Sequence, residues 1–466
     1  MNEPVSLRRV LKFRTVVSTS TGLAYAAISL LSCIQLASSL GGDSGWIAIL
    51  IAGLLAILAA LCFSELNALY PTAAAVRLYM KEAFGDNFSL VITFGYLLTI
   101  IAVIAADSYV VGSAITYAFN LPHWASLIWI LVLLGLAMGA NLRGIKIAGL
   151  LQDITTYSLL AFIIVISLIS LGQHGFQLRS PFDAFGHPLD LINAVAIGVF
   201  IFSGFEWVTP LSEEINDIGQ IPRGMFISLG LLGISYALFT VASSHLLDVH
   251  SANVINSSVP QMLLAQAALG QVGMWLMLIA TLFTAVMTFN GGFATASRFL
   301  YAAAREDVLP PVFSRISISF AVPYVAVLFL AISSAAIAVL IFFTNLFSVL
   351  ILLGAVLEAL IYTIAGLCVI RLRRRQPEAP RMFRIRGGLI FPILTVMVFG
   401  VLGILASLAI GSTVMIGLPL IITIAMMGLS ALYVFLVIPK LRAAAAVRQA
   451  TRRRRPQREA SGTEAG

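Results

Sequence analysis

Apolar runs recur along the whole chain, and each is close to the ~20 residues with which an α-helix crosses a bilayer. Twelve runs qualify, at approximately 15–40, 46–69, 89–118, 124–140, 147–171, 191–212, 224–247, 271–304, 320–343, 346–370, 391–411 and 413–437. Within lipid, each segment must satisfy its own backbone polar groups, which a helix does internally. The pattern therefore predicts an all-α membrane protein with 12 transmembrane helices.

The basic residues predict how these spans are oriented. If the N-terminal segment 1–14 is cytoplasmic, every one of the 28 Lys and Arg residues except Arg179 falls on the cytoplasmic side. Cytoplasmic loops retain such residues because their translocation is opposed. We therefore expect a multi-pass protein of the cytoplasmic membrane with both termini inside. The basic tail 438–466 is expected to be disordered and to lie near anionic lipid.

Composition excludes several classes of function. The chain is 60% hydrophobic and 10% charged, whereas soluble domains carry about 25% charged residues. The net charge of +8 comes mostly from two Arg-rich segments, so it does not indicate nucleic-acid binding. The three cysteines, Cys33, Cys62 and Cys368, lie far apart inside apolar runs, and no zinc or nucleotide motif occurs. We expect no cofactor, no metal and no enzymatic activity.

Two of the runs contain residues that hold a helix poorly. Ser18–Gly22 lies within the first run and Phe202–Glu206 within the sixth. Interruptions at matching positions of two halves are typical of inverted-repeat transporters, whose substrate site lies at the breaks. The alternative is that these small residues form tight helix-packing faces. We favour discontinuous helices at the first and sixth spans.

Breaks of this kind can bind a zwitterion without any charged side chain. The start of a half-helix presents N–H groups that suit a carboxylate, and exposed carbonyls suit an ammonium group. Back-bonding of the hydroxyls within an ordinary helix remains the alternative. The predicted substrate-binding residues are Ser20, Thr21 and Gly22 at the first break and Phe202, Ser203, Gly204 and Phe205 at the second.

Acidic residues within spans are costly, so each one suggests a function. Glu206 directly follows the second break, and we assign it to a protonatable gate or to proton coupling. Asp107 lies near the middle of the third span and could add substrate-binding negative charge. Glu65, near the inner end of the second span, is expected to be structural or part of an inner gate. Glu358 receives no partner from the sequence.

Several motifs in order resemble the amino acid–polyamine–organocation (APC) superfamily. They follow spans two and four, fill the sixth span, end the eighth, and follow the tenth. The segments are Tyr70–Ala75, Asn141–Lys146, Phe202–Glu206 with Glu213, Glu214 and Ile221–Arg223, Ser297–Asp307 and Leu372–Arg384. Each motif is weak alone, but their order over a twelve-span background is specific.

The resemblance implies a 5+5 inverted-repeat, leucine-transporter-like fold. The first repeat would be 15–171, the second 191–371, and the last two spans, 391–437, would lie outside both. Phe200 aligns with a gating aromatic of some family exchangers. Two departures matter: Ala74 and Ala75 replace the family's Gly pair, and the lysine that many symporters carry in the fifth span falls on Leu159.

Together these features predict a permease for amino acids or related amines that works by alternating access. Its energy would come from a proton gradient or from exchange, so the expected partners are a small-molecule substrate and a coupling proton. A polyamine or organocation carrier is the nearest alternative, favoured by Asp107 and Glu206. A non-transporting nutrient sensor is a further alternative. The substrate, the direction of transport and the oligomeric state stay open.

Overall fold

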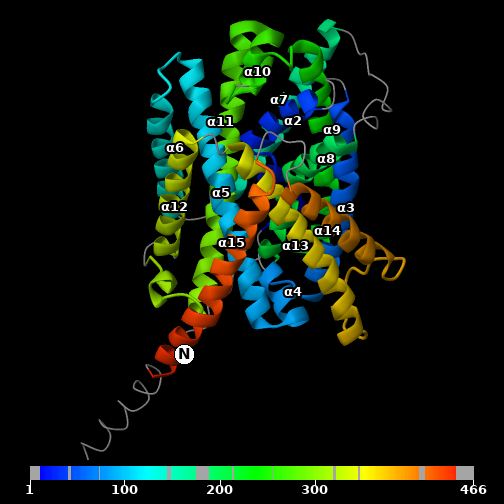
Figure 1. The fold of residues 1–466 in the computed structure, drawn as a ribbon, viewed down its shortest axis with the longest axis vertical. Helices are drawn as coiled ribbons and strands as arrows, with labels where there is room; N and C mark the ends of the chain where they lie inside the picture. The colour runs from blue at the N-terminus through cyan, green and yellow to red at the C-terminus, as the bar shows by residue number, and fades with distance from the viewer. Residues whose placement is uncertain are drawn as a thin grey trace, which may run out of the picture.

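A computed structural model describes residues 11–39, 44–72, 74–143, 148–174, 188–212, 215–255, 257–317, 322–344, 347–408 and 415–447. Its long helices run mostly along one axis, with α4 at one end of the molecule and α10 at the other (Figure 1). Within the described residues, extended pairing is limited to one isolated bridge between Leu11 and Ile215. The predicted all-α architecture is confirmed.

The elements follow the expected repeat order. The first half comprises α1 (Phe13–Ala24), α2 (Ala27–Ser39), α3 (Gly45–Leu69), α4 (Ala75–Phe84), α5 (Asp86–Ala118), α6 (Ala125–Leu142) and α7 (Ala148–His174). The second half comprises α8 (Pro188–Phe202), η3 (Phe205–Leu211), α9 (Gln220–Leu246), α10 (Ala252–Ile255), α11 (Pro260–Arg305), η4 (Pro311–Ser314), α12 (Tyr324–Phe343) and α13 (Phe347–Arg375). After these come α14 (Ile390–Leu408), α15 (Leu418–Leu432) and the π-helical turn η5 (Tyr433–Val437).

The number of spans agrees with the sequence. Among the described residues, 11 helices are long and apolar enough to cross a membrane, and the bent pair α1 and α2 makes up to 12. α11 begins earlier than expected because a separate helical piece joins it through non-helical backbone at Leu269 and Gly270. The last span stays helical as far as Val447, so residues 438–447 are ordered helix where a disordered tail was expected. Residues 448–466 lie outside the described part.

Small residues let the helices approach closely around the centre of the bundle. A Cβ added at Gly198 of α8 would lie 2.8 Å from the Cβ of Ala52 on α3. One added at Gly292 of α11 would lie 2.7 Å from the Ile104 side chain of α5. Such contacts are typical of helix association in lipid, where van der Waals packing replaces the hydrophobic effect. They hold the first and second repeats against each other.

The first helix is interrupted, but not where the sequence suggested. α1 continues as a regular helix through Ser20 and Gly22 to Ala24, and α2 starts at Ala27 after a bend of 57°. The predicted break at Ser18–Gly22 is therefore wrong in position. The Ser18 hydroxyl is bonded to the Thr15 carbonyl at 3.2 Å, which leaves the helix intact at that point.

The second interruption lies where the sequence placed it. α8 ends at Phe202, and Gly204 takes a left-handed conformation with φ of 108° before the 3-10 helix η3 begins. A Cβ on Gly204 would lie 3.0 Å from the backbone of Leu23 and of Ala24. The second break therefore touches the end of α1, and the two interruptions form one buried junction.

Replacing Gly204 by Ala tests this junction. The substitution would place a Cβ in a left-handed conformation and against backbone atoms that cannot move aside. We expect the free energy of unfolding to fall by about 2 kcal/mol or more, measured as thermal denaturation of the purified protein in detergent. Gly230→Ala is the matched control, because Gly230 is helical and no atom lies within 4 Å of its added Cβ. Equal stability of the two variants would contradict this packing.

Candidate functional site

Side chains from other helices satisfy the backbone on both sides of the first break. The amide of Ile28 donates to Asp107 Oδ1 at 3.2 Å. On the other side, the hydroxyl of Tyr236 donates to the carbonyl of Ala24 at 2.7 Å, and Ser29 donates to the same oxygen at 3.0 Å. The rings of Tyr25 and Tyr236 stack with centroids 5.0 Å apart. Helix ends carry unpaired backbone groups, and these contacts supply their partners.

Glu206 performs the corresponding task at the second break. Its Oε2 accepts the amide hydrogen of Gly204 at 3.1 Å and the hydroxyl of Tyr362 at 3.3 Å. Its Oε1 accepts the hydroxyl of Tyr96 at 2.9 Å. Glu206 is 1% exposed. The carboxyl group predicted as a gate thus joins the second break to α5 and α13.

A second carboxyl group lies close to this cluster. Glu358 on α13 is buried and interacts electrostatically with Glu206. Its Oε2 has no hydrogen-bond partner among the described residues. Two carboxyl groups near one another in an apolar interior favour a shared proton over two charges. The cluster of Tyr96, Glu206, Glu358 and Tyr362 can therefore hold a proton inside the protein.

Phe200 lies between the second break and an apolar cavity. The cavity has a volume of about 190 Å³ and is lined by residues of α2, α5, α8, α12, α13 and α15. The Phe200 ring packs directly against the backbone of Gly354, where no side chain could fit. Phe200 is therefore placed to move in or out of this space, and its role as a gate stays a prediction.

The other aromatic residues of the second break are fully buried in packing contacts. Phe202 meets Tyr236 edge to face, with centroids 5.7 Å apart. Phe205 packs against Phe63 and Tyr362 at 6.4 and 5.9 Å. The Ser203 hydroxyl returns to the carbonyl of its own helix, at Phe200.

The residues predicted to bind substrate at the first break lie inside α1. The hydroxyls of Ser20 and Thr21 are buried and make no hydrogen bond within the described part of the chain. Gly22 is covered by Gln152 and Thr156 of α7, and a Cβ there would lie 2.5 Å from Thr156 Oγ1. Thr156 also donates to the carbonyl of Ser18 at 3.2 Å. Their role in binding substrate stays a prediction.

Asp153 of α7 attaches the first half of the interrupted helix to its neighbour. It accepts hydrogen bonds from the hydroxyls of Thr15, at 3.2 Å, and of Ser18. It also pairs with Arg14 Nε at 3.1 Å. This group, which we call the Asp153 cluster, fixes α1 against α7 at the end of the bundle that carries α4.

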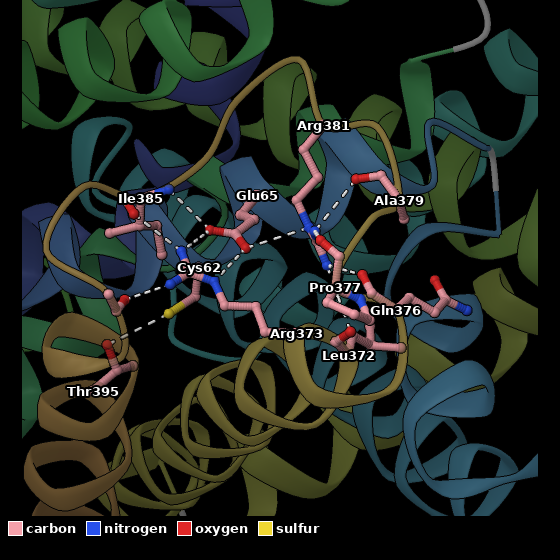
Figure 2. A network of polar contacts seen from close by, with 11 residues as sticks. Cys62, Glu65, Leu372, Arg373, Gln376, Pro377, Ala379, Arg381, Ile385 and Thr395 are labelled. Atoms are coloured by element: carbon pink, nitrogen blue, oxygen red, sulfur yellow. Dashed lines mark hydrogen bonds and ion pairs between the residues drawn. The ribbon is translucent and has the colours of Figure 1, made fainter.

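Glu65 forms a second polar network at the same end, which Figure 2 shows. Its two oxygens accept Arg373 Nε at 2.7 Å and Arg373 Nη2 at 2.5 Å. The amide of Ile385 donates to Oε2 at 2.9 Å, and Arg381 Nε lies 3.5 Å from Oε1. Arg381 also donates to carbonyls of its own loop. Glu65 thus ties α3 to α13 and to the loop that leads to α14.

The loop after α13 is further held by Tyr70 at the end of α3. Its hydroxyl donates to Gln376 Oε1 at 2.8 Å. Partial burial raises the pKa of Tyr70 above its ordinary value, so the hydroxyl remains protonated and available as a donor. The segment Tyr70–Ala75, less Ala73, which lies outside the described residues, is therefore part of a structural connection.

Several residues of the site were missed by the sequence analysis. Tyr96, Tyr236 and Tyr362 lie within apolar spans, where a buried hydroxyl needs a partner, and this signal was available. Asp153 was also visible as an acidic residue inside the run 147–171. Of the motif residues, Glu213, Glu214 and 144–147 lie outside the described part.

Comparison with known proteins adds the family to this geometry. The family model described as "Amino acid permease" matches residues 11–432 of the chain. The chain belongs to the amino acid permease family. The match covers both interrupted helices, the Glu206 cluster and the Glu65 network.

Curated relatives are similar at moderate identity. The chain is 28% identical over 362 residues to the large neutral amino acids transporter small subunit 2 of Oryctolagus cuniculus, covering 74% of the chain and 65% of that protein. It is 25% identical to the Asc-type amino acid transporter 1 of Homo sapiens, covering 72% and 65%. It is 23% identical to the methylthioribose transporter of Bacillus subtilis (strain 168), covering 75% and 78%. The chain thus spans just under two thirds of the length of the first two relatives.

Solved structures share the fold of this amino acid permease. A manganese transporter of Eremococcus coleocola superposes with a TM-score of 0.59 at 16% identity, covering 95% of the chain and 99% of that structure. A Na⁺-coupled sialic acid symporter gives 0.54 at 14% identity, covering 86% and 90%. These likenesses establish the 5+5 inverted-repeat fold and carry no information about the substrate.

Replacing Glu65 by Gln tests the network of Figure 2. The change leaves Arg373 buried without its charged partner, and breaking such a pair costs on the order of 3 kcal/mol. We expect a lower thermal denaturation midpoint in detergent, whereas Glu378→Gln, at an exposed position of the same loop, leaves it unchanged. An unaltered midpoint for Glu65→Gln would show that the network is not stabilising.

Replacing Asp153 by Asn tests whether the Asp153 cluster keeps α1 closed against α7. Losing the charge weakens the contacts to Arg14 and Ser18, so a cysteine at Ser20 should react faster with a maleimide in detergent. About 1 kcal/mol of lost interaction corresponds to about fivefold faster labelling.

The background for this experiment is low because Cys33, Cys62 and Cys368 are all buried. Asp217→Asn, at an exposed loop position, serves as the matched control. Identical labelling rates in Asp153→Asn and Asp217→Asn proteins would mean that the Asp153 cluster does not restrain α1.

Proposed function

We propose that this chain is a secondary active transporter that moves amino acids or related amines across a membrane by alternating access. The observation that carries the proposal is the buried junction of two interrupted helices, where Gly204 approaches Leu23 and Ala24. Interrupted helices at the middle of a bilayer persist where they bind a substrate or ion. The family and the amino acid transporters among its relatives support the same conclusion.

The orientation follows from the basic residues. The end of the bundle that carries α4 also carries Arg77, Arg373 and Arg381, each paired with acidic groups. Because cytoplasmic loops retain Lys and Arg, we place this end and both termini in the cytoplasm, and the protein in the cytoplasmic membrane. Anionic lipid would attract the Arg-rich tail.

Glu206 is the residue we assign to energy coupling. It binds the backbone of the second break and reaches both α5 and α13 through Tyr96 and Tyr362. Gain or loss of a proton would change which of these hydrogen bonds form, and hence how η3 packs against the two helices. Substrate movement and proton movement would then depend on the same side chain. Exchange of one substrate for another is the alternative that needs no proton.

The direct test is uptake into proteoliposomes of a labelled panel of amino acids, monoamines and polyamines, with and without an inward proton gradient. A transporter accumulates at least one member of the panel, and proton coupling makes that accumulation depend on the gradient. A sensor without transport activity moves none of them. Absence of flux, from protein whose folding is verified, would contradict the proposal.

Replacing Glu206 by Gln separates coupling from exchange. Glutamine keeps acceptor and donor atoms but cannot take up a proton, so gradient-driven accumulation should fall to the level of passive exchange. Exchange of internal for external substrate should continue at a measurable rate. Glu378→Gln, which removes an exposed carboxylate, should retain both activities. Undiminished gradient-driven accumulation in Glu206→Gln would remove Glu206 from the coupling mechanism.

A further inference from the structure

The anion position at the start of α2 is already filled by the protein. The first amides of a helix have no partner within the helix and attract negative charge. Here the amides of Ala27 and Ile28 both face the carboxylate of Asp107, and Asp107 Oδ1 accepts the Ile28 hydrogen at 3.2 Å. Asp107 is 0% exposed. A substrate carboxylate placed at this half-helix would meet a group of its own charge.

The second oxygen of Asp107 is free. Asp107 Oδ2 is buried and makes no hydrogen bond within the described part of the chain. The hydroxyl of Thr288 on α11 lies beside this carboxylate, and it too lacks a hydrogen bond of normal geometry. Among the described residues, no Lys or Arg forms an ion pair with Asp107. A buried carboxylate with a free oxygen is suited to a cationic hydrogen-bond donor.

The space next to Asp107 suits an apolar body. The cavity of about 190 Å³ is bordered by Ile28, whose amide binds Asp107, and by Ala106, the residue before it. Phe200 and Gly354 form the opposite side. Glu206 offers no free oxygen for a second ammonium, since both its oxygens accept hydrogen bonds. Glu358 does not line this cavity.

We infer that the substrate is a protonated monoamine with an apolar body and no carboxylate, and that Asp107 Oδ2 accepts a hydrogen bond from its ammonium group. This inference rests on the proposed transport function and narrows its substrate class. The carboxylate of Asp107 takes the place that an amino acid's own carboxylate would need. The substrate then supplies the positive charge that the protein leaves out.

Matched pairs of ligands test this inference on the native protein. Phenethylamine and phenylalanine share a body and differ in the carboxylate, as do isoamylamine and leucine. We expect the amines to raise the thermal denaturation midpoint in detergent with apparent affinity about tenfold or more above that of the amino acids. 2-Phenylethanol, which has the same body without the charge, should bind as weakly as phenylalanine. Tighter binding of the amino acids, or equal binding of the alcohol, would overturn the inference.

Asp107→Asn tests the residue itself. Asparagine can still accept the Ile28 hydrogen but carries no charge, so phenethylamine affinity should fall about tenfold or more. Asp248→Asn, which alters an exposed aspartate outside the spans, should bind as the native protein does. Unchanged amine affinity in Asp107→Asn would overturn the assignment. The paired-ligand comparison needs no variant, so it decides the question even if Asp107→Asn does not fold.

Flux measurements separate failure of this inference from failure of the transport function. Amino acid uptake without any amine preference would leave the transporter intact and contradict the role of Asp107. Inhibition of exchange by external phenethylamine, and not by phenylalanine, would support both. Because neutral amines cross lipid unaided, inhibition and binding are measured in place of amine accumulation.

Discussion

The backbone groups at the two helix interruptions must find partners inside a protein that lies in lipid. An unpaired amide or carbonyl costs several kcal/mol in that environment, so the interruptions exist only because other helices serve them. Asp107 of α5 serves the start of α2, and Tyr236 of α9 serves the end of α1. Glu206 serves its own interruption and is held by Tyr96 and Tyr362. Each interruption is therefore stable only while these helices keep their positions.

This dependence links local structure to conformational change. α1 is fixed to α7 by the Asp153 cluster at the end that carries α4, while its other end meets Gly204 and Tyr236. Movement of α1 away from α7 would break a small group of polar contacts and leave the apolar core of the bundle largely unaltered. Glu65 and Arg373 meanwhile keep α3 and α13 together. The structure thus combines one weakly held helix segment with a firmly tied frame.

The sequence predicted the spans and their number because length and hydropathy decide them. It also located the second interruption, since Gly204 adopts a conformation that other residues resist. The first interruption could not be located from Ser18–Gly22 alone. Its position depends on Asp107 and Tyr236, which are distant in sequence, and Ser18 proved compatible with a continuous helix. Asp153 was present in a predicted span, but its value came from Arg14 and Thr15, which only the fold brings near.

The most direct test of the account is a cryo-electron microscopy structure in lipid nanodiscs, with a substrate identified by the uptake panel. The account predicts density for the substrate at the junction of the two interruptions, in contact with Asp107 and next to Phe200. Substrate density elsewhere in the bundle would contradict it. So would a first helix that runs unbroken through Tyr25 and Ala26, with Asp107 bonded to no backbone amide.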